Sequence, residues 1–157
     1  MTKVGITGHR VIPEAALDYV AGRIESFLAR QAAPLVGYSS LAAGADQLFA
    51  QLVLRAGGEL VAVIPCDGYE STFCPDTLRV YQELVARAGQ VTTLEFPQPG
   101  DPAYIAASHV VVSMSDVVVA VWDGGPANRR GGTADTVWAA WRRGIPVLNA
   151  WPQAARR

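Results

Sequence analysis

The stretch VVVAVW, at residues 117–122, is the most apolar short run in the chain and predicts a buried β-strand. Its successive β-branched residues leave no polar face, which is typical of a strand covered by other layers on both sides. The run is also shorter than an ordinary buried helix. We therefore predict a strand at Val117–Trp122 that lies centrally in a parallel sheet.

On both sides of this run, short β-branched stretches alternate with longer stretches of helical spacing. The predicted strands are Lys3–Thr7, Leu35–Tyr38, Leu60–Ile64, Val91–Phe96, Val117–Trp122 and Pro146–Ala150. The predicted helices are Pro13–Arg30, Ala43–Arg55, Pro75–Ala88, Pro102–Met114 and Gly132–Arg143. This alternation predicts an α/β fold with a mostly parallel sheet of about six strands and helices on both faces.

The composition describes a compact protein rather than a disordered or polycationic one. Of the 157 residues, 50% are hydrophobic and 17% are charged, and the formal net charge is -1. A chain of this length is the size of one ordinary domain, so residues 1–157 are predicted to form a single domain. Lys3 is the only lysine and the arginines are scattered, which does not favour a nucleic-acid partner.

The sequence predicts a cytoplasmic protein with no membrane partner. Its start lacks a basic stretch followed by an apolar one, and no apolar run approaches the roughly 18 residues of a spanning helix. The two cysteines, Cys66 and Cys74, are predicted to be structural and reduced. Because the two histidines and two cysteines lack ligand spacing, no metal site is predicted.

Three predicted strand-to-helix loops carry small or polar residues: 7–10, 39–46 and 123–133. In open α/β sheets, ligands bind beyond the carboxyl ends of the strands, where the strand order reverses. The three loops meet in one crevice if the first strand lies between the second strand and VVVAVW. We expect the chemistry of this protein in that crevice.

The third loop suits a phosphate because it leads into the last helix. Backbone N–H groups at Gly131 and Gly132 can hold an anion at the helix N-terminus, while the Thr133 hydroxyl caps the helix or contacts the ligand. A tight turn followed by an ordinary N-cap explains the same residues. Arg129 and Arg130 suggest an anion-binding lid, and a solvated loop tip explains them equally well.

The first two loops carry further candidates. Gly8 allows close approach of an anion, Arg10 can pair with a phosphate or carboxylate, and His9 can act as an acid, a base or a plain hydrogen-bonding residue. In the second loop, Asp46 can accept hydrogen bonds from ribose hydroxyls or complement the helix dipole. The other candidates of this loop are Ser39, Ser40 and Gly44.

Five further positions are weighed between a functional and a structural interpretation. Tyr69 and Glu70 follow the third strand, where an aromatic ring can stack on a base or simply cover the sheet. Trp138 and Trp141 are predicted to lie in the core or at a subunit interface. His109, in an apolar helix, is predicted to be a core histidine with satisfied hydrogen bonds.

The motifs GITGHR, GAD, WDGG, GGTADTV and RGIPV occur in this order along nearly the whole chain. Together they resemble the SLOG superfamily of Rossmann-like nucleotide-binding domains, which includes the LOG phosphoribohydrolases, the DprA single-strand binders and the YspA-type stand-alone proteins. The resemblance implies a Rossmann-like fold and a homodimer. It assigns phosphate-loop positions to Gly8, Gly44, Gly131, Gly132 and Thr133, flanked by Arg10 and Asp46.

The sequence departs from the LOG enzymes at their catalytic positions. Their P-G-G-x-G-T-x-x-E motif places a glutamate where this chain has Thr136, and their arginine falls near Ala107. Cleavage of an N-glycosidic bond needs a fixed carboxylate beside the sugar. The candidates for this role are Asp123, Asp135, Asp46 and Glu70.

The leading prediction is a sensor or carrier of a nucleotide or nucleotide-derived ligand, such as a nucleoside phosphate or ADP-ribose, with no other cofactor. The predicted ligand-binding residues are Gly8, His9, Arg10, Ser39, Ser40, Gly44, Asp46, Asp123, Gly124, Gly131, Gly132 and Thr133. The first alternative is a LOG-like phosphoribohydrolase acting on a nucleoside 5′-monophosphate. The second is a ligand-free interaction module that uses Trp138, Trp141 and Trp151.

Overall fold

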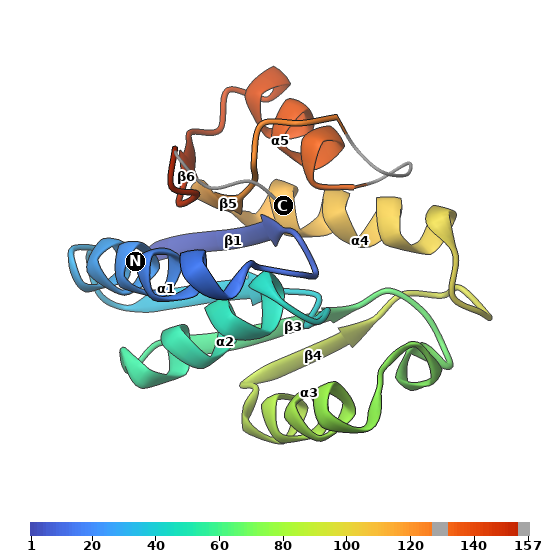
Figure 1. Cartoon of the computed structure of the whole chain (residues 1–157). Coiled ribbons are helices and arrows are strands. Elements are labelled where there is room, and N and C mark those ends of the chain that lie inside the picture. Colours follow the sequence, from blue (N-terminus) through green and yellow to red (C-terminus); the bar gives the residue numbers. More distant parts are fainter. Residues whose placement is uncertain (127–131, 154–157) are drawn as a thin grey trace.

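The computed structural model describes residues 1–126 and 132–153 as an α/β fold (Figure 1). Its strands are β1 (Thr2–Gly8), β2 (Leu35–Ser39), β3 (Glu59–Ile64), β4 (Gln90–Thr93), β5 (Val117–Val121) and β6 (Val147–Asn149). Its helices are α1 (Glu14–Ala29), α2 (Ala45–Arg55), α3 (Pro75–Arg87), α4 (Asp101–Met114), α5 (Thr133–Arg142) and the short 3₁₀ helix η1 (Tyr69–Thr72). The predicted alternation of strands and helices is confirmed.

All neighbouring strands of the sheet are parallel, and their order is β4-β3-β2-β1-β5-β6. The chain moves outward from β1 to β4 and then returns to the other side of β1 to form β5 and β6. The strand order therefore reverses between β1 and β5, which is where open α/β sheets bind ligands. This placement of β1 between β2 and β5 is the arrangement that brings the three predicted loops together.

Helices cover both faces of the sheet. Helices α1, α2 and α3 pack in sequence on one face, while α4 and α5 pack on the other (Figure 1). Alternate residues of β3 serve the two layers: Leu60 and Ile64 join the cluster that includes α3, and Val61 and Val63 join the cluster that includes α4. Among the described residues, no helix combines the length and the apolar character needed to cross a membrane.

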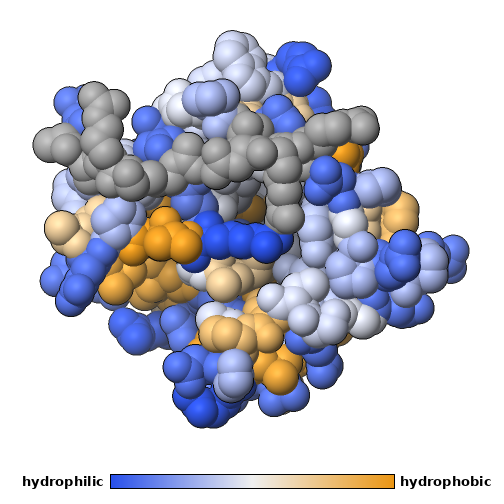
Figure 2. Space-filling model, turned by 45° about the vertical axis from the view of Figure 1, so that its right-hand side comes forward, coloured by the Kyte–Doolittle hydropathy of each residue, from blue (hydrophilic) through white to orange (hydrophobic). Residues whose placement is uncertain are grey.

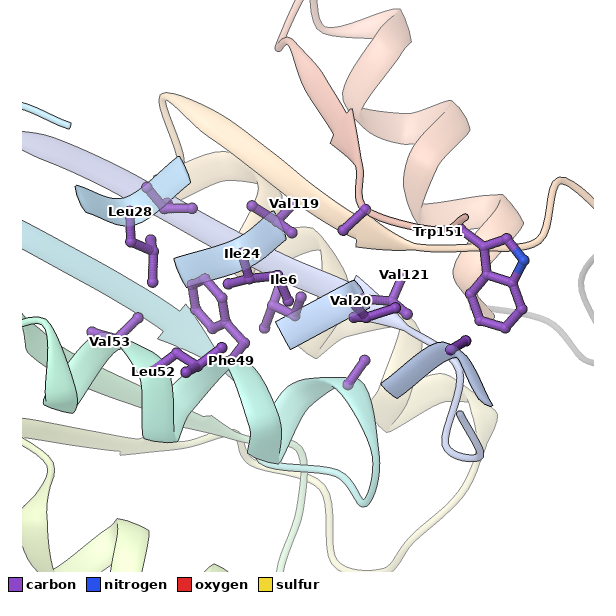
Figure 3. Close-up of a cluster of buried hydrophobic side chains, with 14 residues drawn as sticks. Ile6, Val20, Ile24, Leu28, Phe49, Leu52, Val53, Val119, Val121 and Trp151 are labelled. Atoms are coloured by element: carbon purple, nitrogen blue, oxygen red, sulfur yellow. The ribbon is translucent and has the colours of Figure 1, made fainter. Parts of the chain in front are cut away.

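The largest apolar cluster lies between α1, α2 and the strands β1 and β5 (Figure 3). The predicted stripe of α1 is confirmed at Ala16, Val20, Ile24 and Leu28, which are all buried, while Phe27 packs at its margin. Figure 3 shows Trp151 at the end of this cluster, beyond β5. This tryptophan is 8% exposed, so it belongs to the core and not to a surface contact.

The prediction that Val117–Trp122 is the central strand was wrong. Strand β5 is second from the edge, although its residues from Val118 onward are fully buried. Apolar composition indicates burial on both faces, which the helices provide, and it does not indicate position in the sheet. Strand β4 ends at Thr93 and is shorter than predicted, and beyond it the Phe96 carbonyl accepts the N–H of Asp67 in the loop that follows β3.

The exposure of side chains on α4 and α5 bears on two predictions. Trp138 and Trp141 are 54% and 46% exposed, which excludes the core alternative, and a subunit interface through them stays a prediction. His109 is exposed, because the inward positions of α4 are Ala103, Ala107 and Val111. The apolar neighbours of His109 in the sequence surround the helix and do not mark its inner face.

Candidate functional site

A pocket of about 460 Å³ lies beyond the carboxyl ends of the parallel strands. In Figure 1, β1 points toward the right-hand side of the molecule, and Figure 2 brings that side forward. Hydrophobic and hydrophilic residues lie next to one another on the surface seen in Figure 2. The described residues that line the pocket are Ile6, Thr7, Gly8, His9, Arg10, Val11, Ser40, Ala42, Asp46, Pro65, Tyr69, Tyr104, Ala107, Ser108, Val111, Pro126, Gly132, Thr133 and Ala134. The three predicted loops therefore meet in one crevice.

Gly44 joins the first two loops at a point where only glycine fits. Its φ is +83°, and an added Cβ would overlap the backbone carbonyl groups of His9 and Arg10. The next residue, Ala45, donates its backbone N–H to the His9 carbonyl at 3.1 Å. Gly44 does not line the pocket. Its observed contacts hold α2 against the end of β1.

Gly8 also has a packing role. An added Cβ would overlap the side chain of Ala45 and would lie 2.8 Å from the Cβ of Val121. The end of β1 therefore lies closer to both α2 and β5 than a residue with a side chain would allow. Unlike Gly44, Gly8 also contributes to the pocket wall.

His9 and Asp123 connect the end of β1 to the loop after β5. The Nε2 atom of His9 lies 3.2 Å from Oδ1 of Asp123 and accepts the Asp123 backbone N–H at 3.1 Å. The Asp123 carboxylate also accepts the N–H of Gly125 at 3.0 Å, and Trp151 packs edge-on against the imidazole. Both side chains are nearly buried, at 9% and 13% exposed. Asp123 is not a wall of the pocket, whereas His9 is.

Asp46 is half-buried in the pocket wall, in the first turn of α2. Its Oδ2 accepts the backbone N–H of Ala42 at 3.3 Å. Burial raises the pKa of Asp46 from 3.8 to about 7, against the opposing effects of the Ala42 N–H and the positive charge of Arg10. The pocket therefore contains a carboxyl group that exchanges its proton near neutral pH.

Ser39 supports this loop from below and does not reach the pocket. Its buried hydroxyl accepts the N–H of Leu41 at 3.0 Å and donates to the Asp46 carbonyl at 3.1 Å. Leu41 is fully buried with a φ of 59°, an unusual conformation for a residue with a side chain. Ser40, in contrast, lines the pocket. The two adjacent serines thus have different roles.

The N-terminus of α5 forms another part of the wall. Gly132 occupies the N-cap position, and no side chain caps the helix among the described residues. Of the two roles predicted for the Thr133 hydroxyl, the helix cap is excluded because Thr133 is the first helical residue, and contact with a ligand stays a prediction. Thr136 instead donates its hydroxyl to the Gly132 carbonyl at 3.1 Å. The first backbone N–H groups of α5 lie at the pocket, where a helix favours an anion.

Two tyrosines complete the pocket. Tyr104 of α4 lies under the guanidinium of Arg10, with 5.6 Å between Cζ and the ring centroid. Tyr69 of η1 is 4% exposed and packs edge-on against Phe73 and Tyr81. Burial, followed by the nearby charge of Asp46, raises the pKa of the Tyr69 phenol. Tyr69 was among the residues singled out from the sequence, whereas Tyr104 was not, because its only sequence signal is an aromatic residue near the start of a helix.

The remaining candidates lie elsewhere. Asp135 is exposed beside a separate shallow groove of about 210 Å³ between α4 and α5, and Glu70 is exposed on η1. Gly124 is exposed, with a φ of +84°, and does not line the pocket. Of the four candidate carboxylates, Asp46 is therefore the one in the pocket wall. Gly131, Arg129 and Arg130 lie outside the described residues.

The chemistry of the two cysteines differs. Both cysteines are free; Cys66 is buried, whereas Cys74 is exposed at the start of α3. The prediction that both are structural stays a prediction. Within residues 1–126 and 132–153, no three His, Cys, Asp or Glu side chains gather in a way that could hold a metal ion.

The sequence matches no protein-family model and no curated protein. The structure is similar to DNA processing protein A (DprA) from Streptococcus pneumoniae, with a TM-score of 0.70 and 22% identity over 95% of this chain. It is similar to DprA from Helicobacter pylori, with a TM-score of 0.68 and 23% identity over 94% of this chain. It is also similar to the molybdenum cofactor carrier protein of Chlamydomonas reinhardtii, with a TM-score of 0.56 and 18% identity over 94% of this chain.

These similarities confirm a Rossmann-like α/β fold that the chain shares with these proteins. The chain spans 50% of the Streptococcus protein, 64% of the Helicobacter protein and 75% of the Chlamydomonas protein. At this level of identity, the comparisons establish the architecture and leave the ligand to be argued from the residues of the pocket.

The substitution Gly44→Ala is expected to lower the free energy of unfolding by about 2–4 kcal/mol, because it combines backbone strain with overlap against the first loop. Gly57→Ala is the matched control, since Gly57 has a φ of +81° but no atom within 4 Å of the added Cβ. It should cost about 1 kcal/mol. Urea denaturation measures both; equal losses would contradict the close contact at Gly44.

The raised pKa of Asp46 predicts a pH-dependent stability. Between pH 3.8 and about 7 the folded chain holds the Asp46 proton more tightly than the unfolded chain, so the free energy of unfolding decreases as pH rises. The slope is at most about 1.4 kcal/mol per pH unit. Urea denaturation from pH 5 to 8 should show this decrease relative to Asp46→Asn. The exposed Asp67→Asn is the control, and its profile should parallel the wild type.

Proposed function

We propose that the chain binds a nucleotide or nucleotide-derived ligand, such as a nucleoside phosphate or ADP-ribose, as a sensor or carrier. The single observation that supports this most is the pocket of about 460 Å³ at the point where the strand order reverses. Ligand pockets of a few hundred cubic ångströms at this position suit one small molecule.

The N-terminus of α5 is the proposed phosphate site. Gly132 has no side chain, so an anion can approach the backbone closely. The first residues of α5 line the pocket, and among the described residues no side chain caps their N–H groups. The Thr133 hydroxyl lies beside them in the same wall. Arg10 adds a positive charge on an exposed, long side chain that can pair with a phosphate in two hydrogen bonds.

A single small ligand fits this pocket better than a nucleic-acid strand does. The Helicobacter relative binds single-stranded DNA, and the Chlamydomonas relative carries the molybdenum cofactor. Among the described residues that line the pocket of this chain, Arg10 is the one cationic side chain. Binding along a strand needs a basic groove that neutralises several phosphates. We therefore propose a free nucleotide rather than DNA as the ligand.

A bulky residue at Gly132 should weaken nucleotide binding at least tenfold. Gly132 has an extended backbone with a φ of −74°, a conformation that valine also adopts, so Gly132→Val keeps the backbone and places methyl groups at the start of α5. Isothermal titration calorimetry with nucleoside monophosphates, NAD, ADP-ribose and cyclic nucleotides should show binding by the wild type and at least a tenfold loss in this variant. Gly22→Val, at an open position on α1, is the control. Unchanged affinity in Gly132→Val would refute the phosphate site.

A second candidate function is hydrolysis of the N-glycosidic bond of a nucleoside 5′-monophosphate. The observation that favours it is Asp46, whose pKa of about 7 suits a general acid at neutral pH. In this reaction the protonated carboxyl donates its proton to the departing base as the bond between base and sugar breaks. Water then adds to the sugar carbon, and the carboxylate recovers a proton from that water.

Chromatography of nucleotides incubated with the protein tests this candidate. A hydrolase should release free base, and Asp46→Asn should reduce the rate at least a hundredfold because its amide cannot donate the proton. The control is Glu70→Gln, since Glu70 is exposed and away from the pocket wall. If saturated wild-type protein releases no base, the hydrolase is excluded and the carrier proposal stands.

A further inference from the structure

Tyr69 lines the pocket with a side chain whose hydroxyl has no hydrogen-bond partner among residues 1–126 and 132–153. The side chain is 4% exposed. No fully buried polar side-chain atom in that part of the chain lacks a partner, so the hydroxyl keeps access to the pocket. A phenol held in this way is available to a ligand.

The surroundings of Tyr69 fix its position. Its ring packs edge-on against Phe73 at 5.1 Å and Tyr81 at 5.7 Å, and lies at a tilt to Tyr104 at 6.3 Å. These contacts come from η1, α3 and α4, so the ring is held from several sides. The hydroxyl therefore needs no rearrangement before it donates, and the usual entropic cost of ordering a side chain on binding is largely absent.

Asp46 lines the same pocket and provides the complementary group. Its carboxyl is close enough for its charge to raise the pKa of the Tyr69 phenol, yet no hydrogen bond joins the two. The phenol therefore stays protonated at neutral pH and has an O–H to donate. The Asp46 carboxylate accepts hydrogen bonds, and the Ala42 N–H fixes one of its oxygens. A donor and an acceptor thus face the same space.

We infer that Tyr69 and Asp46 bind the sugar hydroxyls of the ligand, and that the pocket selects ribonucleotides over nucleotides that lack these hydroxyls. A hydroxyl group both accepts and donates, so one ribose hydroxyl can accept from Tyr69 and the same or the neighbouring one can donate to Asp46. An analogue without the hydroxyls leaves both groups unpaired in a half-buried wall, which binding penalises strongly. This inference rests on the proposed nucleotide function and names the ligand class for it.

Calorimetry with two classes of ligand and three proteins tests the inference. The ligands are the four ribonucleoside 5′-monophosphates and their 2′,3′-dideoxy counterparts. The proteins are the wild type, Tyr69→Phe and Tyr81→Phe. Tyr81 is the matched control because it is 6% exposed and belongs to the same aromatic cluster but does not line the pocket. Thermal denaturation confirms that each variant, which loses one oxygen atom, is folded.

The expected result is a selective loss. The wild type should bind the ribonucleotide roughly 5- to 30-fold more tightly than the dideoxy form. Tyr69→Phe should bind the ribonucleotide roughly 3- to 10-fold more weakly and the dideoxy form within about twofold of the wild type. Tyr81→Phe should match the wild type with both ligands.

Three results would overturn the inference. Equal affinity of the wild type for both ligands would show that the hydroxyls are not bound, and an equal loss of both in Tyr69→Phe would leave Tyr69 a packing residue. In both cases nucleotide binding itself would stand. No binding of either ligand by the wild type would overturn the proposed function together with the inference.

Discussion

The site depends on the contact between Gly44 and the backbone of His9 and Arg10. A left-handed glycine without a side chain lets the start of α2 lie directly against the end of β1, and the hydrogen bond from Ala45 to His9 fixes the distance. Because of this contact, Asp46 and Arg10 enter one pocket from two different loops. Any Cβ at residue 44 would force the loops apart and widen the space between the two charged side chains.

This arrangement places an acidic side chain, Asp46, in a pocket whose other charged features favour an anion, and protonation of Asp46 reduces the repulsion. The N-terminus of α5 and Arg10 favour an anion, whereas an ionised Asp46 in the same wall would repel it. The pKa of about 7 means that Asp46 is protonated in much of the population at neutral pH, so the repulsion is reduced without loss of the polar group. An acidic residue can therefore share a pocket with a phosphate.

The fold was largely predictable because it rests on local patterns. The alternation of β-branched runs with helical spacing predicted all six strands, and glycine-bearing loops predicted the edge of the sheet where the pocket lies. Tyr104 was missed because its role depends on which side of α4 faces the sheet, and that side carries the ordinary residues Ala107 and Val111. The same limit explains His109, since an apolar sequence around a helix does not specify its inner face.

The side of the pocket that carries polar groups has changed relative to the LOG pattern. At the position of the LOG glutamate, Thr136 turns its hydroxyl to the Gly132 carbonyl, and near the position of the LOG arginine, Ala107 leaves the α4 wall without charge. Polar groups of the pocket wall come from several elements, and among them are Asp46 at the start of α2 and Tyr69 of η1. A ligand whose phosphate lies at α5 would extend its sugar toward these two groups. In the proposed function, phosphate and sugar are therefore bound at separate parts of the pocket wall, the phosphate at the start of α5 and the sugar at Asp46 and Tyr69.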